Sequence, residues 1–421
     1  MKVFKFGGAS VKDAKAVKNV GEILKLFPDE SILVVVSAMG KTTNALEKLV
    51  DAVFYKEENA AEVLSEIKKY HFDIISELFP SKDHPIYNEI SNTFVELDWA
   101  AEDEPTENYN YEYDKIVSMG EVISTKIVQA YLKEVGLKAV WKDVRDFIQT
   151  DNTYREGKVD WELTQQQVDQ LLKPELESGN IIITQGFIGG TSENFTTTLG
   201  REGSDYTAAI LAYTTNSESV TIWKDVPGVL NADPKWFDET KLLEQISYQD
   251  AIELAYYGAT VIHPKTIKPL QNKKIPLHVK SFVDPKLKGT VINDVQTPLP
   301  IPSFIFKVNQ VLISISPKDF SFIVEENFSE IFNLFAERQV KVNVMQNSAI
   351  SFSVSVDLDE RKLPDLIKTL QKDYRVLYNE GLELITIRYY DQATIDRVTI
   401  DKKILLEVKS RYTVQLVVKP L

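Results

Sequence analysis

The sequence predicts an α/β protein with a mostly parallel sheet over residues 1–297, followed by a smaller α+β region. In the first part, short β-rich runs alternate with helical patterns, which is typical of parallel strands connected by helices. The run Ile32–Val36 is continuously apolar, as expected of a central strand that is covered on both faces. A proline-rich segment and a change to a βαββαβ pattern mark the second part.

The predicted elements of the first part begin with a strand at 2–6, a glycine turn and an amphipathic helix. Ser10 is a candidate N-cap of this helix, with Asp13 three residues later completing a capping box. Residues 44–100 have the pattern of long helices. Residues 101–114 (AEDEPTENYNYEYD) are acidic and lack helical apolar spacing, so we expect a solvated surface insertion there.

The second part follows the segment 297–302, where alternating prolines prevent a helix and favour an extended linker. Residues 305–380 fit one complete βαββαβ unit, with separate strands at 375–378 and, in the tail, at 383–389. Little in the tail 381–421 looks like a full helix, so this segment is too short for a second complete unit.

Composition argues against several classes of function. The 421 residues carry a net charge of −14, and an acidic protein repels phosphate backbones, so no nucleic-acid partner is expected. The absence of cysteine excludes disulfides, thiol nucleophiles and cysteine-ligated metals. The four histidines lack ligand spacing, which argues against a histidine metal site or a catalytic triad. Without a signal peptide or a run long enough to span a membrane, we expect a cytoplasmic protein.

Two polar turns follow predicted parallel strands near the N-terminus. In the first, KFGGAS, Gly7 and Gly8 would let backbone N–H groups approach an anion, and Lys5 adds a positive charge, although this motif alone favours a tight turn with a surface lysine. The second, SAMGKTTN, is not a P-loop, because Val35 stands where that motif needs glycine. It remains a polar turn at the carboxyl end of a strand, where ligands of open α/β sheets bind.

Three further segments combine turns with charged side chains. The segment 196–206 (TTTLGREGSDY) joins a flexible turn, a guanidinium suited to carboxylate or phosphate, and a helix start. Here Arg201 also fits a surface ion pair, and Asp205 a mere N-cap. The segments 223–235 and 257–265 end in charged turns that contain proline and glycine.

Taken in order, these segments resemble the aspartate kinases of the amino-acid kinase family. The resemblance rests on KFGGAS, VVVSAMG, SMGE, QGFIG, TTLGREGSDYTA, WKDVPGV, ADPK and YGATVIHPKT. It implies a three-layer α/β/α domain over residues 1–297 and the reaction ATP + L-aspartate → ADP + 4-phospho-L-aspartate, with Mg²⁺ bound through the ATP phosphates. A carboxylate acceptor is already ionised at pH 7, so such an enzyme needs positioning and charge neutralisation rather than a general base.

The resemblance also assigns roles to residues. Lys5 would stabilise the transferring phosphoryl group, and Asp205 would orient Lys5 or engage Mg²⁺–ATP. Arg201 would bind the α-carboxylate of aspartate and Glu121 its α-ammonium group. Further substrate contacts are expected from Thr43 and Ser204, and nucleotide contacts from Gly7, Gly8, Ser10, Ser37, Lys224, Asp225 and Lys235. Departures from the family pattern occur at Glu202, Lys224, Leu230 and Thr260, which affects the expected nucleotide contacts.

The second part resembles the ACT domains of aspartate kinases, which bind amino-acid effectors and join protomers. By this resemblance, residues 305–380 form one ACT-like domain and 381–421 a reduced second segment, and we expect a homodimer through this region. Because Ala349 follows Ser348 where lysine-inhibited relatives have an acidic residue, feedback by lysine should be weak or absent. Two alternatives stay open: another amino-acid kinase, such as a glutamate 5-kinase, and a catalytically silent amino-acid sensor.

Overall fold

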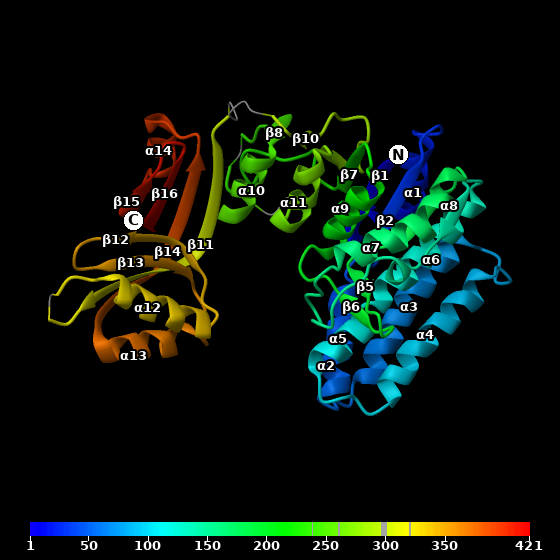
Figure 1. Ribbon diagram of the computed structural model, residues 1–421, viewed down its shortest axis with the longest axis horizontal. Coiled ribbons are helices and arrows are strands. Elements are labelled where there is room, and N and C mark those ends of the chain that lie inside the picture. The colour runs from blue at the N-terminus through cyan, green and yellow to red at the C-terminus, as the bar shows by residue number, and fades with distance from the viewer. Residues whose placement is uncertain (238, 260–261, 296–300, 320) are drawn as a thin grey trace. The chain divides into compact units, whose positions relative to one another are not determined.

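The computed structural model describes residues 1–237, 239–259, 262–295, 301–319 and 321–421. It divides into two compact units (Figure 1). The first comprises Met1–Val229, Glu244–Ile252 and Val261–Thr297, and the second Leu230–Leu243, Glu253–Thr260 and Pro298–Leu421. No helix within the described ranges is long and apolar enough to cross a membrane.

The first unit is built on an eight-stranded sheet in the order β3-β4-β2-β1-β7-β9-β10-β8. All neighbouring pairs are parallel except β9 and β10, which confirms the predicted mostly parallel sheet. The strands are β1 (Lys2–Phe6), β2 (Ile32–Val36), β3 (Ala139–Trp141), β4 (Ile181–Gln185), β7 (Ser219–Lys224), β8 (Gln245–Ser247), β9 (Leu277–Ser281) and β10 (Thr290–Asn293). A separate antiparallel pair joins β5 (Ile188–Gly190) and β6 (Thr196–Thr198).

Alternation along β1 explains which helices cover which face of this sheet. Phe4 and Phe6 point into a core with helices α1 (Ala14–Lys25) and α6 (Met119–Glu134), and the intervening Lys5 points to the opposite face. There it meets α9 (Gly203–Thr215), which contacts β1, β2 and β7. Strand β2 is buried at every position, as its continuous apolar run predicts.

The remaining helices of the first unit lie between these strands in sequence. They are α2 (Thr42–Phe54), α3 (Ala60–Leu78), α4 (Ile86–Glu102), α5 (Tyr109–Val117), α7 (Trp161–Gln167), α8 (Lys173–Glu177), α10 (Tyr248–Tyr257, whose last residues belong to the second unit) and α11 (Pro264–Lys273), with short helical turns at Gly8–Val11, Val144–Asp146 and Val168–Leu172.

Two local predictions in this unit are wrong. The N-cap of α1 is Asp13, whose carboxylate accepts from the Ala16 N–H at 2.7 Å, whereas Ser10 lies in the preceding turn Gly8–Val11. The acidic stretch 101–114 is not simply a solvated insertion, because its last residues start α5 and Tyr113 and Asp114 are buried. Asn108 caps that helix by accepting from two backbone N–H groups.

The second unit contains a six-stranded antiparallel sheet in the order β12-β13-β11-β14-β16-β15. Its elements are β11 (Ser303–Pro317), α12 (Glu325–Glu337), β12 (Val342–Asn347), β13 (Phe352–Asp357), α13 (Leu363–Asp373), β14 (Tyr374–Arg388), α14 (Gln392–Val398), β15 (Lys402–Lys409) and β16 (Thr413–Pro420). Residues 375–378 and 383–389, predicted as separate strands, belong to one strand apart from Tyr389, and β14 runs through position 381. The tail also contains the short helix α14 between its strands.

Candidate active site

A cavity of about 980 Å³ opens in the first unit, where the carboxyl ends of β1 and β2 meet the first turns of α6 and α9. This is the edge at which open α/β sheets bind ligands. Of the predicted site residues, the cavity is lined by Lys5, Ser37, Thr43, Glu121, Arg201, Ser204 and Asp205. The structure therefore brings together side chains from turns that lie far apart in sequence.

Lys5 and Asp205 form an ion pair at the base of this cavity. The Lys5 ammonium lies 2.6 Å from Asp205 Oδ1, and the Asp205 side chain is completely buried. Lys224, at the end of β7, places its ammonium 3.9 Å from the other oxygen of the same carboxylate. Asp205 is thus not the N-cap of α9, the alternative left open by the sequence, but lies in the first turn and holds two cations near one point.

The two N-terminal turns are packed directly against each other. A Cβ at Gly8 would lie 2.7 Å from the Gly40 carbonyl oxygen and 2.8 Å from that of Ala38, so only glycine fits there. The Gly40 N–H donates to the Gly8 carbonyl at 3.0 Å. Gly7 leaves space for Lys5, whose Nζ would be 3.3 Å from a Cβ at that position.

Glu121 is a buried carboxyl group in the first turn of α6. Its side chain is 2% exposed, and Oε1 accepts from the Ala38 N–H at 3.3 Å. Oε2 has no hydrogen-bond partner among the described residues. Burial raises the pKa of Glu121 to about 8, although the Ala38 N–H and the charge of Lys5 act in the opposite direction. The ionised form of Glu121 is therefore poorly stabilised by the protein alone, and a cation that reached this group from the cavity would stabilise it.

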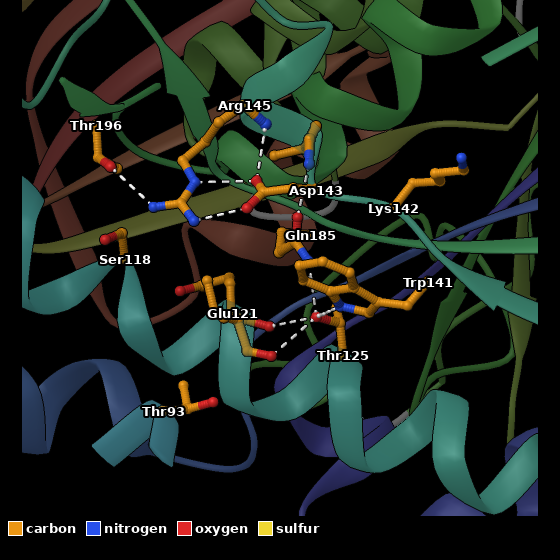
Figure 2. Close-up of polar contacts among 12 residues, drawn as sticks. Thr93, Ser118, Glu121, Thr125, Trp141, Lys142, Asp143, Arg145, Gln185 and Thr196 are labelled. Carbon is orange, nitrogen blue, oxygen red and sulfur yellow. Dashed lines mark hydrogen bonds and ion pairs between the residues drawn. The ribbon is translucent and has the colours of Figure 1, made fainter. Parts of the chain in front are cut away.

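A chain of hydrogen bonds fixes the start of α6 to the sheet (Figure 2). Thr125 Oγ1 donates to the Glu121 carbonyl at 2.9 Å and accepts from Trp141 Nε1 and Gln185 Nε2, each at 2.9 Å. The side-chain oxygen of Gln185, Oε1, in turn accepts from the Val144 N–H at 2.7 Å. Because these groups are largely buried, the network holds the turn that carries Glu121 in one position.

The first turn of α9 carries the other charged groups. Its N-cap is Glu202, which has a left-handed backbone conformation (φ 57°). Burial raises the pKa of the Glu202 carboxyl, and the nearby charge of Asp205 adds to this. A Cβ at Gly186 would lie 2.5 Å from that of Ser204, so the turn after β4 fits closely against this helix start.

Most of the residues predicted to contact the nucleotide do not line this cavity. Ser10 is buried, and its hydroxyl donates to the Trp223 carbonyl at 3.4 Å. This hydrogen bond connects the glycine turn to the end of β7. Asp225 follows that strand and is exposed. Lys235 and Leu230 belong to the segment Leu230–Leu243 of the second unit, so their expected roles stay predictions. Thr260 lies outside the described residues.

Part of the cavity wall was not anticipated from the sequence. Asp114 of α5 is completely buried and accepts from the Thr198 N–H at 2.9 Å, the Thr198 hydroxyl at 2.7 Å and the Arg155 N–H at 2.8 Å. Burial raises its pKa, and these hydrogen bonds oppose that shift. Tyr113 and Arg155 line the cavity beside it. The spacing of Tyr109 and Tyr113, four residues apart, was the available signal for this helix.

The chain belongs to the amino acid kinase family, whose model matches residues 1–281. Within this family it groups with the aspartokinases. It is 32% identical over 396 residues to lysine-sensitive aspartokinase 3 of Escherichia coli, across 91% of this chain and 86% of that protein. It is 33% identical over 408 residues to chloroplastic aspartokinase 1 of Arabidopsis thaliana, across 91% of this chain and 70% of that one.

Solved structures agree with this grouping. Escherichia coli aspartokinase III in complex with lysine and aspartate has a TM-score of 0.85 and 29% identity, with 100% of this chain and 96% of that chain covered. The same enzyme in complex with aspartate and ADP has a TM-score of 0.82 and 28% identity, with the same coverage.

Within the described ranges, no group of three or more histidine, aspartate or glutamate side chains could hold a metal ion.

Proposed function

We propose that the chain transfers the γ-phosphoryl group of ATP to the side-chain carboxylate of L-aspartate, giving ADP and 4-phospho-L-aspartate. The observation that carries this proposal is the Lys5–Asp205 ion pair at the base of a cavity that Glu121 and Arg201 also line. The solved relative that holds aspartate and ADP supports the choice of substrates. The product would enter aspartate-family amino-acid biosynthesis, towards lysine, threonine and methionine.

The chemistry requires no general base. The acceptor carboxylate oxygen attacks the γ-phosphorus, and the bond from that phosphorus to the bridging oxygen of ADP breaks as the new bond forms. Lys5 would neutralise charge that develops on the transferring oxygens, while Asp205 holds the ammonium in place. Mg²⁺ would arrive as part of the nucleotide substrate, bound through its phosphates.

Side chains of opposite charge would bind the two charged groups at the α-carbon of the amino acid. Glu121 would receive the α-ammonium group, Arg201 would bind the α-carboxylate, and Thr43 and Ser204 would donate further hydrogen bonds. On the nucleotide side, backbone N–H groups of Gly7, Gly8 and Ser10 would contact phosphate. Ser37, Lys224, Asp225 and Lys235 would complete the nucleotide site.

A coupled assay of ADP release with a panel of amino acids tests this function. We expect turnover that depends on L-aspartate and is negligible with L-glutamate or N-acetyl-L-glutamate. Turnover with glutamate would favour the glutamate 5-kinase alternative, and absence of turnover with any acceptor, in a protein that still binds amino acids, would favour the silent sensor.

The second unit would assemble the enzyme as a homodimer in the cytoplasm and respond weakly to lysine. The turn at 348–351 contains no acidic residue, so it offers no carboxylate to a lysine effector. Within the fold, the Ala349 carbonyl accepts from the Ile323 N–H, and the Ser348 hydroxyl bonds to Ser351. Light scattering together with initial rates at rising lysine and threonine tests both points. A monomer, or inhibition at sub-millimolar lysine, would contradict the corresponding half.

A further inference from the structure

Two guanidinium groups line the cavity of the first unit, and only one of them, Arg201, has a role so far. The other belongs to Arg155, in the loop between β3 and α7. The two residues lie on touching segments of chain, because a Cβ at Gly200, next to Arg201, would lie 3.2 Å from the Arg155 carbonyl oxygen. The two arginine side chains therefore start from neighbouring segments of the cavity wall.

Arg155 is held in place through its backbone. Its φ of 66° is in the left-handed region, which costs a residue with a side chain on the order of 1 kcal/mol. Its N–H donates to the completely buried Asp114 carboxylate at 2.8 Å, and Asp114 is anchored to Thr198. The loop thus keeps a strained conformation that turns this residue toward the cavity.

The Arg155 side chain stacks on an aromatic surface instead of pairing with a carboxylate. The guanidinium carbon lies 4.2 Å from the centre of the Tyr113 ring and 5.9 Å from that of Tyr109. Both rings are fixed in turn, since Tyr113 donates to Glu47 at 2.7 Å and Tyr109 to Asp51 at 2.6 Å.

This stacking leaves the N–H edge of the guanidinium available. Across the described ranges, the Arg155 side chain has neither a hydrogen bond nor a carboxylate within 4.0 Å. A stacked guanidinium exposes its five donors at the edge of its plane, which is the geometry that binds a carboxylate with two parallel hydrogen bonds. Carboxyl groups of Glu47, Glu156 and Glu202 also line the cavity and repel an anion, so a second arginine adds attraction that opposes this repulsion.

We propose that Arg155 is a second specificity-determining residue, which binds the α-carboxylate of the amino-acid substrate together with Arg201. This inference rests on the proposed function. In this proposal, Tyr109, Tyr113 and Asp114 of α5 position Arg155 of the 153–156 loop for binding. Lys5 and Asp205 act on the side-chain carboxylate of the substrate at the base of the cavity.

The test compares L-aspartate with its α-amide, L-isoasparagine, in Arg155→Ala and the unchanged enzyme. Loss of hydrogen bonds to a charged group should weaken aspartate binding by about tenfold to a hundredfold, measured by isothermal titration and as KM, with kcat and the KM for ATP changed less than about threefold. The affinity for the α-amide should be nearly the same in both proteins, because the charge that Arg155 binds is already absent. Lys158→Ala, a charge removal in the same loop outside the cavity lining, is the matched control.

The outcomes separate this inference from the function itself. If the unchanged enzyme does not phosphorylate aspartate, the proposed function fails. If it does, and Arg155→Ala binds aspartate normally, the inference alone is overturned. It is also overturned if Arg155→Ala weakens aspartate and the α-amide equally, since that pattern would show a structural role for the loop. Arg155→Lys should restore part of the aspartate affinity, because it keeps the charge and loses the planar donor edge.

Discussion

The base of the cavity and its outer wall are built in different ways. At the base, Lys5, Glu121 and Asp205 are nearly or completely buried and come from a strand end and two helix starts. On the outer wall, the exposed Arg155 lies on aromatic rings of α5 and in a strained loop. Burial makes charges at the base interact strongly, whereas solvent at the wall weakens each contact. The base is therefore suited to the chemical step and the wall to the choice of substrate.

The largest effect should follow from changing the base. Lys5→Ala removes the cation next to Asp205 and should lower kcat by roughly a hundredfold or more, as loss of one transition-state donor does elsewhere. Steady-state kinetics check this, with circular dichroism to show that the variant is folded. Near-normal turnover in a folded variant would remove Lys5 from the mechanism and break the proposed division between base and wall.

Arg201 is exposed like Arg155 and should affect recognition more than chemistry. Arg201→Ala should raise the KM for aspartate by about tenfold to a hundredfold and leave ATP binding nearly intact, because the α-carboxylate would lose a charged partner. Isothermal titration with each substrate measures both effects. A collapse of ATP affinity with aspartate binding preserved would show that Arg201 belongs to the nucleotide site instead.

Glu121 makes the base sensitive to pH. Its ordinary pKa of 4.5 rises to about 8 in the fold, so between these values the folded protein keeps a proton that the unfolded chain releases. This group therefore lowers the free energy of unfolding as pH rises through that window. Glu121→Gln, which cannot ionise, should gain stability relative to the unchanged protein between pH 5 and pH 8, measured by urea denaturation. Exposed Glu62→Gln is the control, and an equal gain there would contradict the assignment.

The smallest effect on activity should come from the network beneath Glu121. Thr125→Val keeps the shape of the side chain but leaves the N–H groups of Trp141 and Gln185 without their acceptor, which should cost about 1–3 kcal/mol of stability. We expect the KM for aspartate to rise about threefold as the first turn of α6 loosens. Thr214→Val is the matched control, because that buried hydroxyl donates only to its own helix. Equal losses in both variants would mean that the network has no special role.

The residues at the base of the cavity were assigned through the resemblance to aspartate kinases, since local patterns also fitted a surface lysine at Lys5 and an N-cap at Asp205. Lys5 and Asp205 occur 200 positions apart, and the parallel sheet brings the end of β1 and the start of α9 to one edge, where the two side chains form an ion pair. The fold class was predictable from local pattern, since alternating apolar strands and helical periods leave few arrangements.

The outer wall could not be predicted in the same way. The buried Asp114 and the ring of Tyr113 depend on contacts with residues more than 40 positions away, while the local composition is that of a solvated segment. Register had a similar effect in the second unit. Local pattern shows strands at either end of β14 but not that both ends pair with β11, with two register shifts in the ladder around Gly381.

The length of β11 and β14 has a consequence for how the second unit unfolds. Each strand has 15 residues, and the segment 303–307 of β11 pairs with the last part of β14, while 310–317 pairs back to its first residue. One core lies along the first half of this ladder and a different one along the second. Unfolding of one core alone would therefore break the pairing of β11 and β14 in the middle of both strands and expose their backbone N–H and C=O groups. We expect the second unit to melt in one cooperative transition, with amide hydrogen exchange slowed together on both sides of Gly381.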